Sequence, residues 1–193
     1  MVNIRYAQIR ECDISNGEGI GVALFVQGCH FHCYNCFNQE TWDFNGGKEW
    51  TQEVEDKFIE LASRPYIQRI SILGGEPLAD ENLDGVLKLI NKIRLSCPEK
   101  IIWMYTGYTW NKIIEYKDMA DENDQDDKFY QDFIKDLNMK TRKDIISKCD
   151  VLVDGRYIDS KLDIALKWRG SSNQRVIDVK QSWQKGELVL WTE

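Results

Sequence analysis

The sequence predicts an α/β fold, in which the strands of a mainly parallel sheet alternate with helices. Four short runs are continuously apolar, as expected for strands that are buried on both faces of a parallel sheet. They cover residues 22–26, 70–73, 101–105 and 151–153. Longer stretches with helical periodicity separate them, and this alternation is typical of α/β proteins.

The helix candidates follow from the spacing of their apolar side chains. In the first candidate, Val54, Phe58 and Leu61 share one face, and Glu53 lies near the positive helix start. The second candidate ends before Pro98, which cannot continue a helix. We expect helices over residues 51–64, 82–96, 129–137 and 141–148.

Each of the four predicted strands runs into glycine at its carboxyl end. In parallel α/β folds, ligands bind outside the carboxyl ends of the strands, and glycine there allows close approach of a ligand to the backbone. We therefore expect four turns to meet on one rim, at Gly28, Gly74–Gly75, Gly107 and Gly155.

Length and charge limit the class of protein. The 193 residues suit a single domain over 1–193, and the net charge of −7 argues against a nucleic-acid binder. No apolar run approaches the roughly 20 residues that span a bilayer, and we expect no membrane contact. The amino-terminal residues do not resemble a secretory segment, so we expect a cytoplasmic protein with reduced thiols. A solvated acidic insertion is expected at about 116–128.

Three cysteines within eight residues, Cys29, Cys33 and Cys36, form the most informative motif. Three thiolates hold three corners of a cubane iron–sulfur cluster and leave one iron open, whereas structural metal sites are usually closed by four ligands. A structural zinc site remains an alternative if His30, His32 or Cys149 supplies a fourth ligand. A disulfide framework is disfavoured without export. The isolated cysteines are expected to be small buried apolar residues, namely Cys12, Cys97 and Cys149.

A Gly74-Gly75-Glu76-Pro77 turn follows the second predicted strand. The two glycines expose backbone carbonyl and amide groups, which suit the ammonium and carboxylate of a zwitterion, and Pro77 stiffens the exit. Because the turn follows a three-cysteine loop, it indicates a ligand site much more specifically than the same four residues would alone.

Together, these motifs resemble the radical S-adenosylmethionine superfamily. Within this superfamily, the segment 16–29 resembles the entry segment of the glycyl-radical activating enzymes. The segments 36–42, 105–108, 151–155 and 169–178 together resemble the activating proteins of anaerobic ribonucleoside-triphosphate reductases. The resemblance runs from about Asn16 to Lys180. It implies a small partial (β/α) barrel, a [4Fe–4S] cluster and S-adenosylmethionine, whose reductive cleavage gives a 5′-deoxyadenosyl radical that abstracts hydrogen.

The resemblance also implies roles for particular residues. Cys29, Cys33 and Cys36 would ligate iron, and no catalytic residue is expected beyond the cluster. The methionyl end of the cofactor would meet the Gly-Gly turn, and Asn35 stands where an aromatic residue is common in the superfamily. The residues expected to contact S-adenosylmethionine are Asn35, Cys36, Phe37, Gly74, Gly75, Glu76 and Thr106.

A chain this short cannot bury a substrate by itself, so we expect a protein substrate, the glycine-bearing loop of the large anaerobic ribonucleotide reductase subunit. The resemblance implies a flavodoxin or ferredoxin as electron donor. The polar block 169–175 is expected either to hold the rim together or to contact the cofactor or partner. Alternatives are a small-molecule enzyme such as 7-carboxy-7-deazaguanine synthase, a pyruvate formate-lyase activase, and a non-enzymatic zinc-stabilised interaction module.

Overall fold

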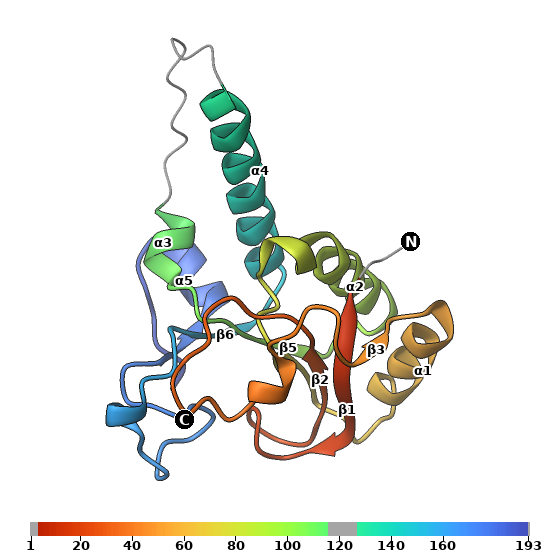
Figure 1. Cartoon of the computed structure of the whole chain (residues 1–193). Helices are drawn as coiled ribbons and strands as arrows, with labels where there is room; N and C mark the ends of the chain where they lie inside the picture. Colours follow the sequence, from red (N-terminus) through yellow and green to blue (C-terminus); the bar gives the residue numbers. More distant parts are fainter. Residues whose placement is uncertain (1–3, 116–126, 193) are drawn as a thin grey trace.

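The computed structural model describes residues 4–115 and 127–192, and of residues 127–132 only the backbone. Within these residues, a seven-stranded sheet has the order β3-β1-β2-β4-β5-β6-β7 (Figure 1). Its strands are β1 Arg5–Asp13, β2 Gly21–Val26, β3 Lys48–Glu49, β4 Arg69–Gly74, β5 Ile101–Tyr105, β6 Val151–Asp154 and β7 Arg175–Asp178. The helices are α1 Gln52–Ala62, α2 Leu83–Ser96, α3 Trp110–Ile114, α4 Asp127–Ser147 and α5 Val179–Lys185.

The predicted α/β order is confirmed in the centre of the sheet. β2, β4, β5 and β6 are parallel neighbours, and each matches one of the predicted apolar runs to within one residue. Helix α1 connects β2 to β4, and α2 connects β4 to β5. The carboxyl ends of these four strands therefore lie on the same edge of the sheet.

The sheet is mixed, which corrects the expectation of a mainly parallel one. β1 and β3 pair antiparallel on one side of the parallel strands, and β7 pairs antiparallel with β6 on the other. The sequence of β1 did not reveal a strand because it is rich in charged and polar residues, and β7 begins inside a polar block. The sheet is not closed, and the partial barrel stays a prediction.

Two predicted helices, 129–137 and 141–148, are one helix, α4. No glycine or proline separates them, so nothing ends the first helix before the second begins. The predicted acidic insertion at 116–128 lies outside the described residues except for its last two, which begin α4.

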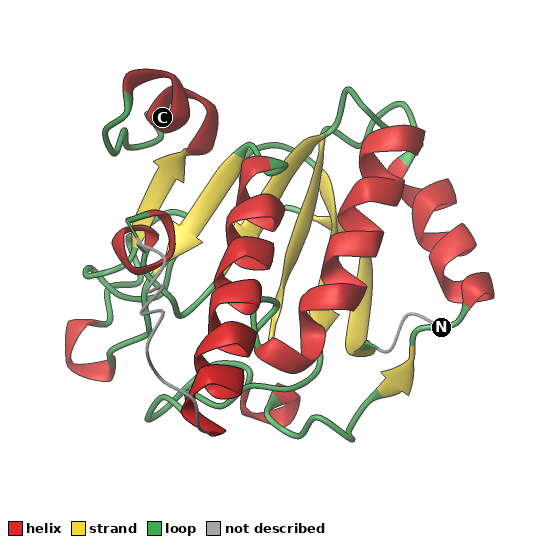
Figure 2. Ribbon diagram, turned by 90° about the horizontal axis from the view of Figure 1, so that it is seen from above, coloured by secondary structure: helices red, strands yellow, loops and turns green. Residues whose placement is uncertain are grey.

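Helices α1, α2 and α4 pack on one face of the sheet (Figure 2). Side chains of β5 alternate between the faces: Ile102 and Met104 join the core under the helices, whereas Trp103 and Tyr105 belong to apolar clusters on the other face. That second face is covered by loops and not by long helices, and this leaves room for a ligand.

The isolated cysteines differ in environment. Cys97 and Cys149 are buried, as predicted, but Cys12 is exposed on β1, where the prediction was wrong. Within the part of the chain that the structure describes, no helix combines the length and apolar character needed to cross a membrane.

Candidate functional site

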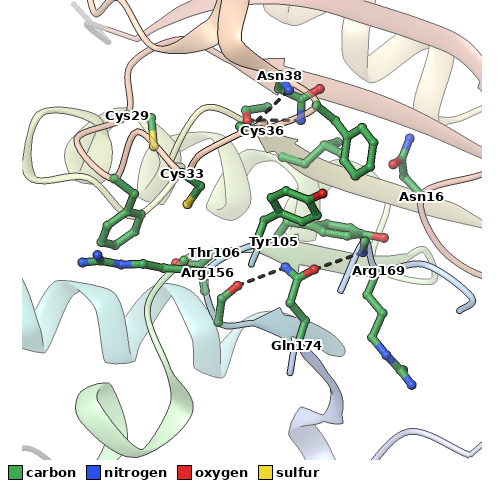
Figure 3. Close-up of a pocket in the computed structure, with 18 of the residues that line it drawn as sticks. Asn16, Cys29, Cys33, Cys36, Asn38, Tyr105, Thr106, Arg156, Arg169 and Gln174 are labelled. Atoms are coloured by element: carbon green, nitrogen blue, oxygen red, sulfur yellow. Dashed lines mark hydrogen bonds between the residues drawn. The ribbon is translucent and has the colours of Figure 1, made fainter. Parts of the chain in front are cut away.

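A cavity of about 600 Å³ lies on the face of the sheet that the long helices leave free. Its volume is in the range of small-molecule sites, about 300–1,000 Å³. Its wall includes all three cysteines of the motif (Figure 3). Glycines also line it, namely Gly74, Gly75, Gly107, Gly155 and Gly170. Of the four predicted glycine turns, only that at Gly28 does not line the cavity.

The loop after β2 brings the three thiols to one side of the cavity. Cys29 is nearly buried, Cys33 and Cys36 are half-buried, and all three are free thiols. The backbone N–H of Cys29 donates to Trp42 O at 3.0 Å, and the N–H of Asn38 donates to Cys36 Sγ at 3.4 Å. The hydrogen bond from Asn38 to the Cys36 sulfur is of the kind that stabilises a thiolate and tunes an iron–sulfur cluster.

Burial favours the protonated form of two of these thiols. It raises the pKa of Cys29 to about 11 and also raises the pKa of Cys33. A bound cation reverses this effect, because a coordinating thiol is deprotonated outright. Burial therefore favours the neutral thiol form of Cys29 and Cys33, and a bound metal favours the thiolate form.

Among the described residues, no group of three His, Cys, Asp or Glu side chains is arranged to hold one metal ion. The nearby histidines are engaged elsewhere: His30 Nε2 lies 2.8 Å from Glu81 Oε1, and the His32 ring stacks on Trp42. A cubane cluster fits this donor set better than a single ion, because each thiolate ligates a different iron.

Asn35 adopts a left-handed backbone conformation, with φ of 53°. Asparagine tolerates this region far better than an aromatic or β-branched residue, so the residue type suits the conformation of the loop. Its side chain is exposed and does not line the cavity. The other six residues expected to contact S-adenosylmethionine do line it.

The Gly-Gly turn packs tightly against the backbone of the neighbouring strand. A Cβ on Gly74 would lie 2.7 Å from Phe25 Cα, and one on Gly75 would lie 2.4 Å from Gly28 O. Gly74 also has a φ of 105°, which side-chain-bearing residues rarely adopt. Only glycine fits here, and the backbone of the turn forms part of the cavity wall.

Glu76 lies buried behind this turn. Its carboxylate accepts hydrogen bonds from the Leu78 N–H, the Thr106 hydroxyl and the Gly107 N–H. Burial raises the pKa of Glu76 from its usual 4.5 to about 7, although these donors and Arg142 oppose the rise. Both oxygens are occupied within the protein, so the carboxylate holds strand ends in place.

The polar block 169–175 forms the rim opposite the cysteines. Gln174 Oε1 accepts from the Gly170 N–H at 3.0 Å, and Gln174 Nε2 donates to Gly155 O at 3.0 Å. Arg169, Gly170 and Gln174 also line the cavity. The block therefore holds the rim together through hydrogen bonds, which is one of the two roles expected from the sequence. It also lines the cavity, where a ligand or partner could contact it.

Sequence reasoning missed several residues of the wall. Asn38 donates to Gly74 O at 3.4 Å, and Arg156 lies over the Phe31 ring at 4.2 Å from its centroid. Tyr105 was not proposed as a site residue, although alternation along its strand places it on the face opposite Met104. Arg156 gave no such signal, because its position depends on how separate loops pack.

Comparison with known proteins identifies the family. The family described as "4Fe-4S single cluster domain" matches residues 15–177. Anaerobic ribonucleoside-triphosphate reductase-activating proteins are similar over nearly their whole length. That of Vibrio cholerae is 36% identical over 89% of this chain and 96% of its own, and that of Escherichia coli K12 is 35% identical over 90% and 97%. The chain belongs to the family of anaerobic ribonucleoside-triphosphate reductase-activating proteins.

An activating protein of Enterobacteria phage T4 is 32% identical over 90% of this chain and 93% of its own. The predicted family resemblance to reductase-activating proteins and the 4Fe–4S domain are thereby confirmed. Within the matched domain, Cys97 and Cys149 are buried in the helix-covered core, whereas the other three cysteines meet at the cavity.

Proposed function

We propose that this chain is a radical S-adenosylmethionine activase that generates a glycyl radical on the large subunit of an anaerobic ribonucleoside-triphosphate reductase. One observation carries the proposal: three free thiols of one loop face a cavity that a Gly-Gly turn also lines. The names of the relatives supply the partner, because those proteins are named for activating this reductase.

Cys29, Cys33 and Cys36 would hold the [4Fe–4S] cluster. Their sulfurs come from one loop, whose backbone is held by hydrogen bonds such as those from Cys29 N–H to Trp42 O and from Cys36 N–H to Cys33 O. A set of three thiolates leaves one iron without a protein ligand. That iron is available to a small molecule in the adjoining cavity.

The cavity wall next to the cysteines would hold S-adenosylmethionine. The backbone of Gly74 and Gly75 forms this wall without intervening side chains, and Phe37 offers an apolar ring. The Gly75 N–H already donates to Val26 O, so the carbonyl oxygens of the turn are the groups that would meet the ammonium of the cofactor. Thr106 and Glu76 support the turn from behind. Asn35 would contribute only through the conformation that it gives to the cysteine loop.

When bound, the cluster and S-adenosylmethionine supply a 5′-deoxyadenosyl radical, which takes a hydrogen atom from glycine. The protein's part is to exclude water and to hold the target near the cofactor. Aromatic side chains line much of the cavity, namely Phe25, Tyr105, Tyr157 and Trp168.

Exposed apolar residues at the mouth of the cavity favour a protein substrate. Phe37 is 65% exposed and Ile164 is 95% exposed, and both line the opening. Apolar side chains left exposed around a site typically mark a surface that another protein covers. A glycine-bearing loop of the reductase would close the cavity, and a flavodoxin or ferredoxin would donate the electron in the cytoplasm.

The test is anaerobic reconstitution followed by mixing with S-adenosylmethionine, a reductant and the reductase large subunit from the same organism. We expect about four irons per chain, release of methionine, and a glycyl doublet in the electron paramagnetic resonance spectrum. Stoichiometric zinc without iron would instead support the zinc-stabilised module. An intact cluster that gives no doublet would contradict the activase assignment.

A further inference from the structure

The cavity has a second end that the proposed cofactor contacts do not use. Figure 3 places Asn16 and Arg169 across the cavity from the three cysteines, with Tyr105 between them. This end is formed by β1, the segment that follows it, β5 and the loop before β7. Its lining includes Arg10, Ser15, Asn16, Tyr105 and Trp168.

The hydroxyl of Tyr105 is a donor without an acceptor. Its oxygen is buried, and among the described residues it has no hydrogen-bond partner. Burial raises the pKa of Tyr105, so the hydroxyl stays protonated and able to donate. A buried polar group that the protein leaves unpaired calls for a partner from outside the chain.

Asn16 offers the complementary acceptor. Its side-chain Nδ2 donates to Asp13 Oδ2 at 2.7 Å, and its backbone N–H donates to Asp13 Oδ1 at 2.9 Å. An ionised carboxylate accepts only, so the nitrogen of the Asn16 amide must face Asp13. The amide oxygen of Asn16 makes no hydrogen bond within the described residues and is left for a donor.

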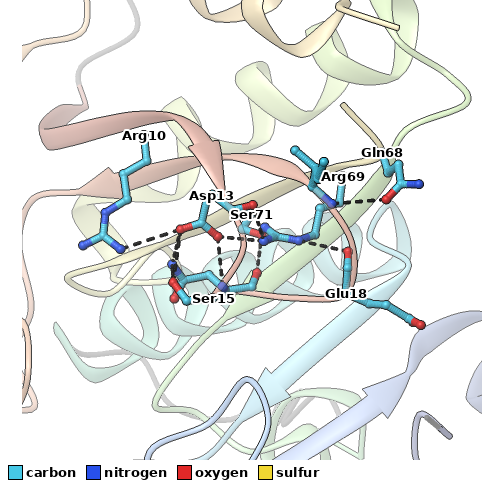
Figure 4. Close-up of polar contacts among 9 residues, drawn as sticks. Arg10, Asp13, Ser15, Glu18, Gln68, Arg69 and Ser71 are labelled. Atoms are coloured by element: carbon cyan, nitrogen blue, oxygen red, sulfur yellow. Dashed lines mark hydrogen bonds and ion pairs between the residues drawn. The ribbon is translucent and has the colours of Figure 1, made fainter. Parts of the chain in front are cut away.

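A buried ion pair fixes this orientation (Figure 4). Arg69 Nη2 lies 2.7 Å from Asp13 Oδ1, and both side chains are almost completely buried. Arg69 also donates to the backbone oxygens of Asp13 and Glu18, and Ser71 donates to Asn16 O. The segment that carries Asn16 is therefore held on the sheet before any partner arrives.

We propose that Tyr105 and Asn16 together bind one peptide group of the partner polypeptide beside its reacting glycine. Tyr105 donates to the peptide carbonyl, and Asn16 Oδ1 accepts from the peptide N–H. This inference rests on the proposed function and extends it to the substrate's backbone.

The two free groups of this end match a peptide group. Tyr105 supplies a neutral donor and Asn16 a neutral acceptor, beside the buried Asp13–Arg69 ion pair and two arginines, Arg10 and Arg169, which also line the cavity. The ammonium and carboxylate of S-adenosylmethionine suit the polar backbone of the Gly-Gly turn instead, at the cysteine end. A backbone contact also leaves the side chains around the glycine free to vary.

The first test is Tyr105→Phe, which removes only the hydroxyl. In the reconstituted protein, we expect the half-saturating concentration of the reductase large subunit to rise about five- to thirtyfold. The dissociation constant of S-adenosylmethionine, measured without the subunit, should change less than twofold. Tyr66→Phe is the matched control, because that side chain is exposed and its hydroxyl accepts a hydrogen bond from Arg64 on the surface.

Two results would overturn the inference. If Tyr105→Phe changes neither quantity, water is the partner of the hydroxyl. If Tyr105→Phe weakens the binding of S-adenosylmethionine more than it weakens the binding of the reductase subunit, the hydroxyl contacts the cofactor. Failure of the proposed function itself is distinguishable, because the unmodified protein would then give no glycyl doublet.

The second test asks whether the two residues share one peptide group. Asn16→Ala should also raise the half-saturating concentration of the subunit. In the double variant, the half-saturating concentration should rise by less than the product of the two single increases, because both changes break contacts to the same peptide group. Effects that multiply fully would contradict a shared peptide group. Iron content and thermal unfolding of each variant show whether the fold is intact.

Discussion

The carboxylate of Glu76, which follows β4, accepts a hydrogen bond of 2.7 Å from the hydroxyl of Thr106, which follows β5. Its second oxygen accepts from the Gly107 N–H, also at 2.7 Å. One buried carboxylate thus joins two strand ends beneath the Gly-Gly turn. Both residues line the cavity, where their predicted contact with the cofactor stays a prediction, and these bonds also let Glu76 position the turn.

Glu76→Gln should destabilise the protein. The amide has one acceptor where the carboxylate has two, so one of its three donors loses its partner in a buried position. We expect a loss of about 1–3 kcal/mol in the free energy of unfolding, measured by urea denaturation of the metal-free protein. The control is Glu187→Gln, an exposed position, where less than about 0.5 kcal/mol is expected.

The same carboxyl predicts a pH dependence of stability. Its pKa is about 7 in the folded protein and about 4.5 when unfolded, so folding favours the protonated form. This stabilisation is complete below about pH 4.5 and is lost as the pH rises through 7. The decline in unfolding free energy over this range should be smaller in Glu76→Gln. Equal slopes in both proteins would show that Glu76 does not titrate there.

Cys36→Ala should abolish assembly of the cluster, because two thiolates cannot hold three corners. The measurement is iron and sulfide content after anaerobic reconstitution, together with the visible absorption of the cluster. Cys12→Ala is the matched control: it removes an exposed thiol on β1 and should leave iron content unchanged. Full iron content in Cys36→Ala would refute the assigned ligands.

Replacements of Asn35 should separate backbone strain from side-chain contacts. Because φ is 53° at this residue, Asn35→Val should cost about 1–2 kcal/mol and weaken cluster retention, whereas Asn35→Gly should retain the cluster. Unfolding free energies and the rate of iron loss to a chelator check this. If Asn35→Gly loses iron as fast as Asn35→Val, the asparagine side chain itself is required.

Asp13→Asn should be strongly destabilising, because it leaves Arg69 buried without a counter-charge. Breaking a buried pair by changing one partner costs about 3–5 kcal/mol. The comparison is Glu11→Gln, which breaks the exposed pair with Arg64 and should cost less than about 1 kcal/mol. Denaturation at pH 7 measures both. A similar small loss in both variants would mean that the buried pair does not anchor the segment after β1.

The sequence predicted the parallel centre of the sheet because burial on both faces demands continuous apolar runs. It predicted the cysteine loop and the Gly-Gly turn as well, since both are local motifs with strict spacing. It missed β1 because this strand at the edge of the parallel set carries charged residues, and it divided α4 because a weak apolar stripe resembles two short helices. Tyr105 appeared in an apolar run and in a segment that carries the family resemblance, but not as a site residue.

What the sequence determined by itself is therefore the chemistry: three thiols after one strand, a Gly-Gly turn after the next, and the family that this order indicates. What only the tertiary structure decided is where groups distant in the chain meet. Glu76 reaches Thr106 and Gly107, and Arg69 reaches Asp13 across 56 positions. Local spacing records which ligands a loop can offer, whereas the pairing of buried polar groups depends on how strands and loops pack.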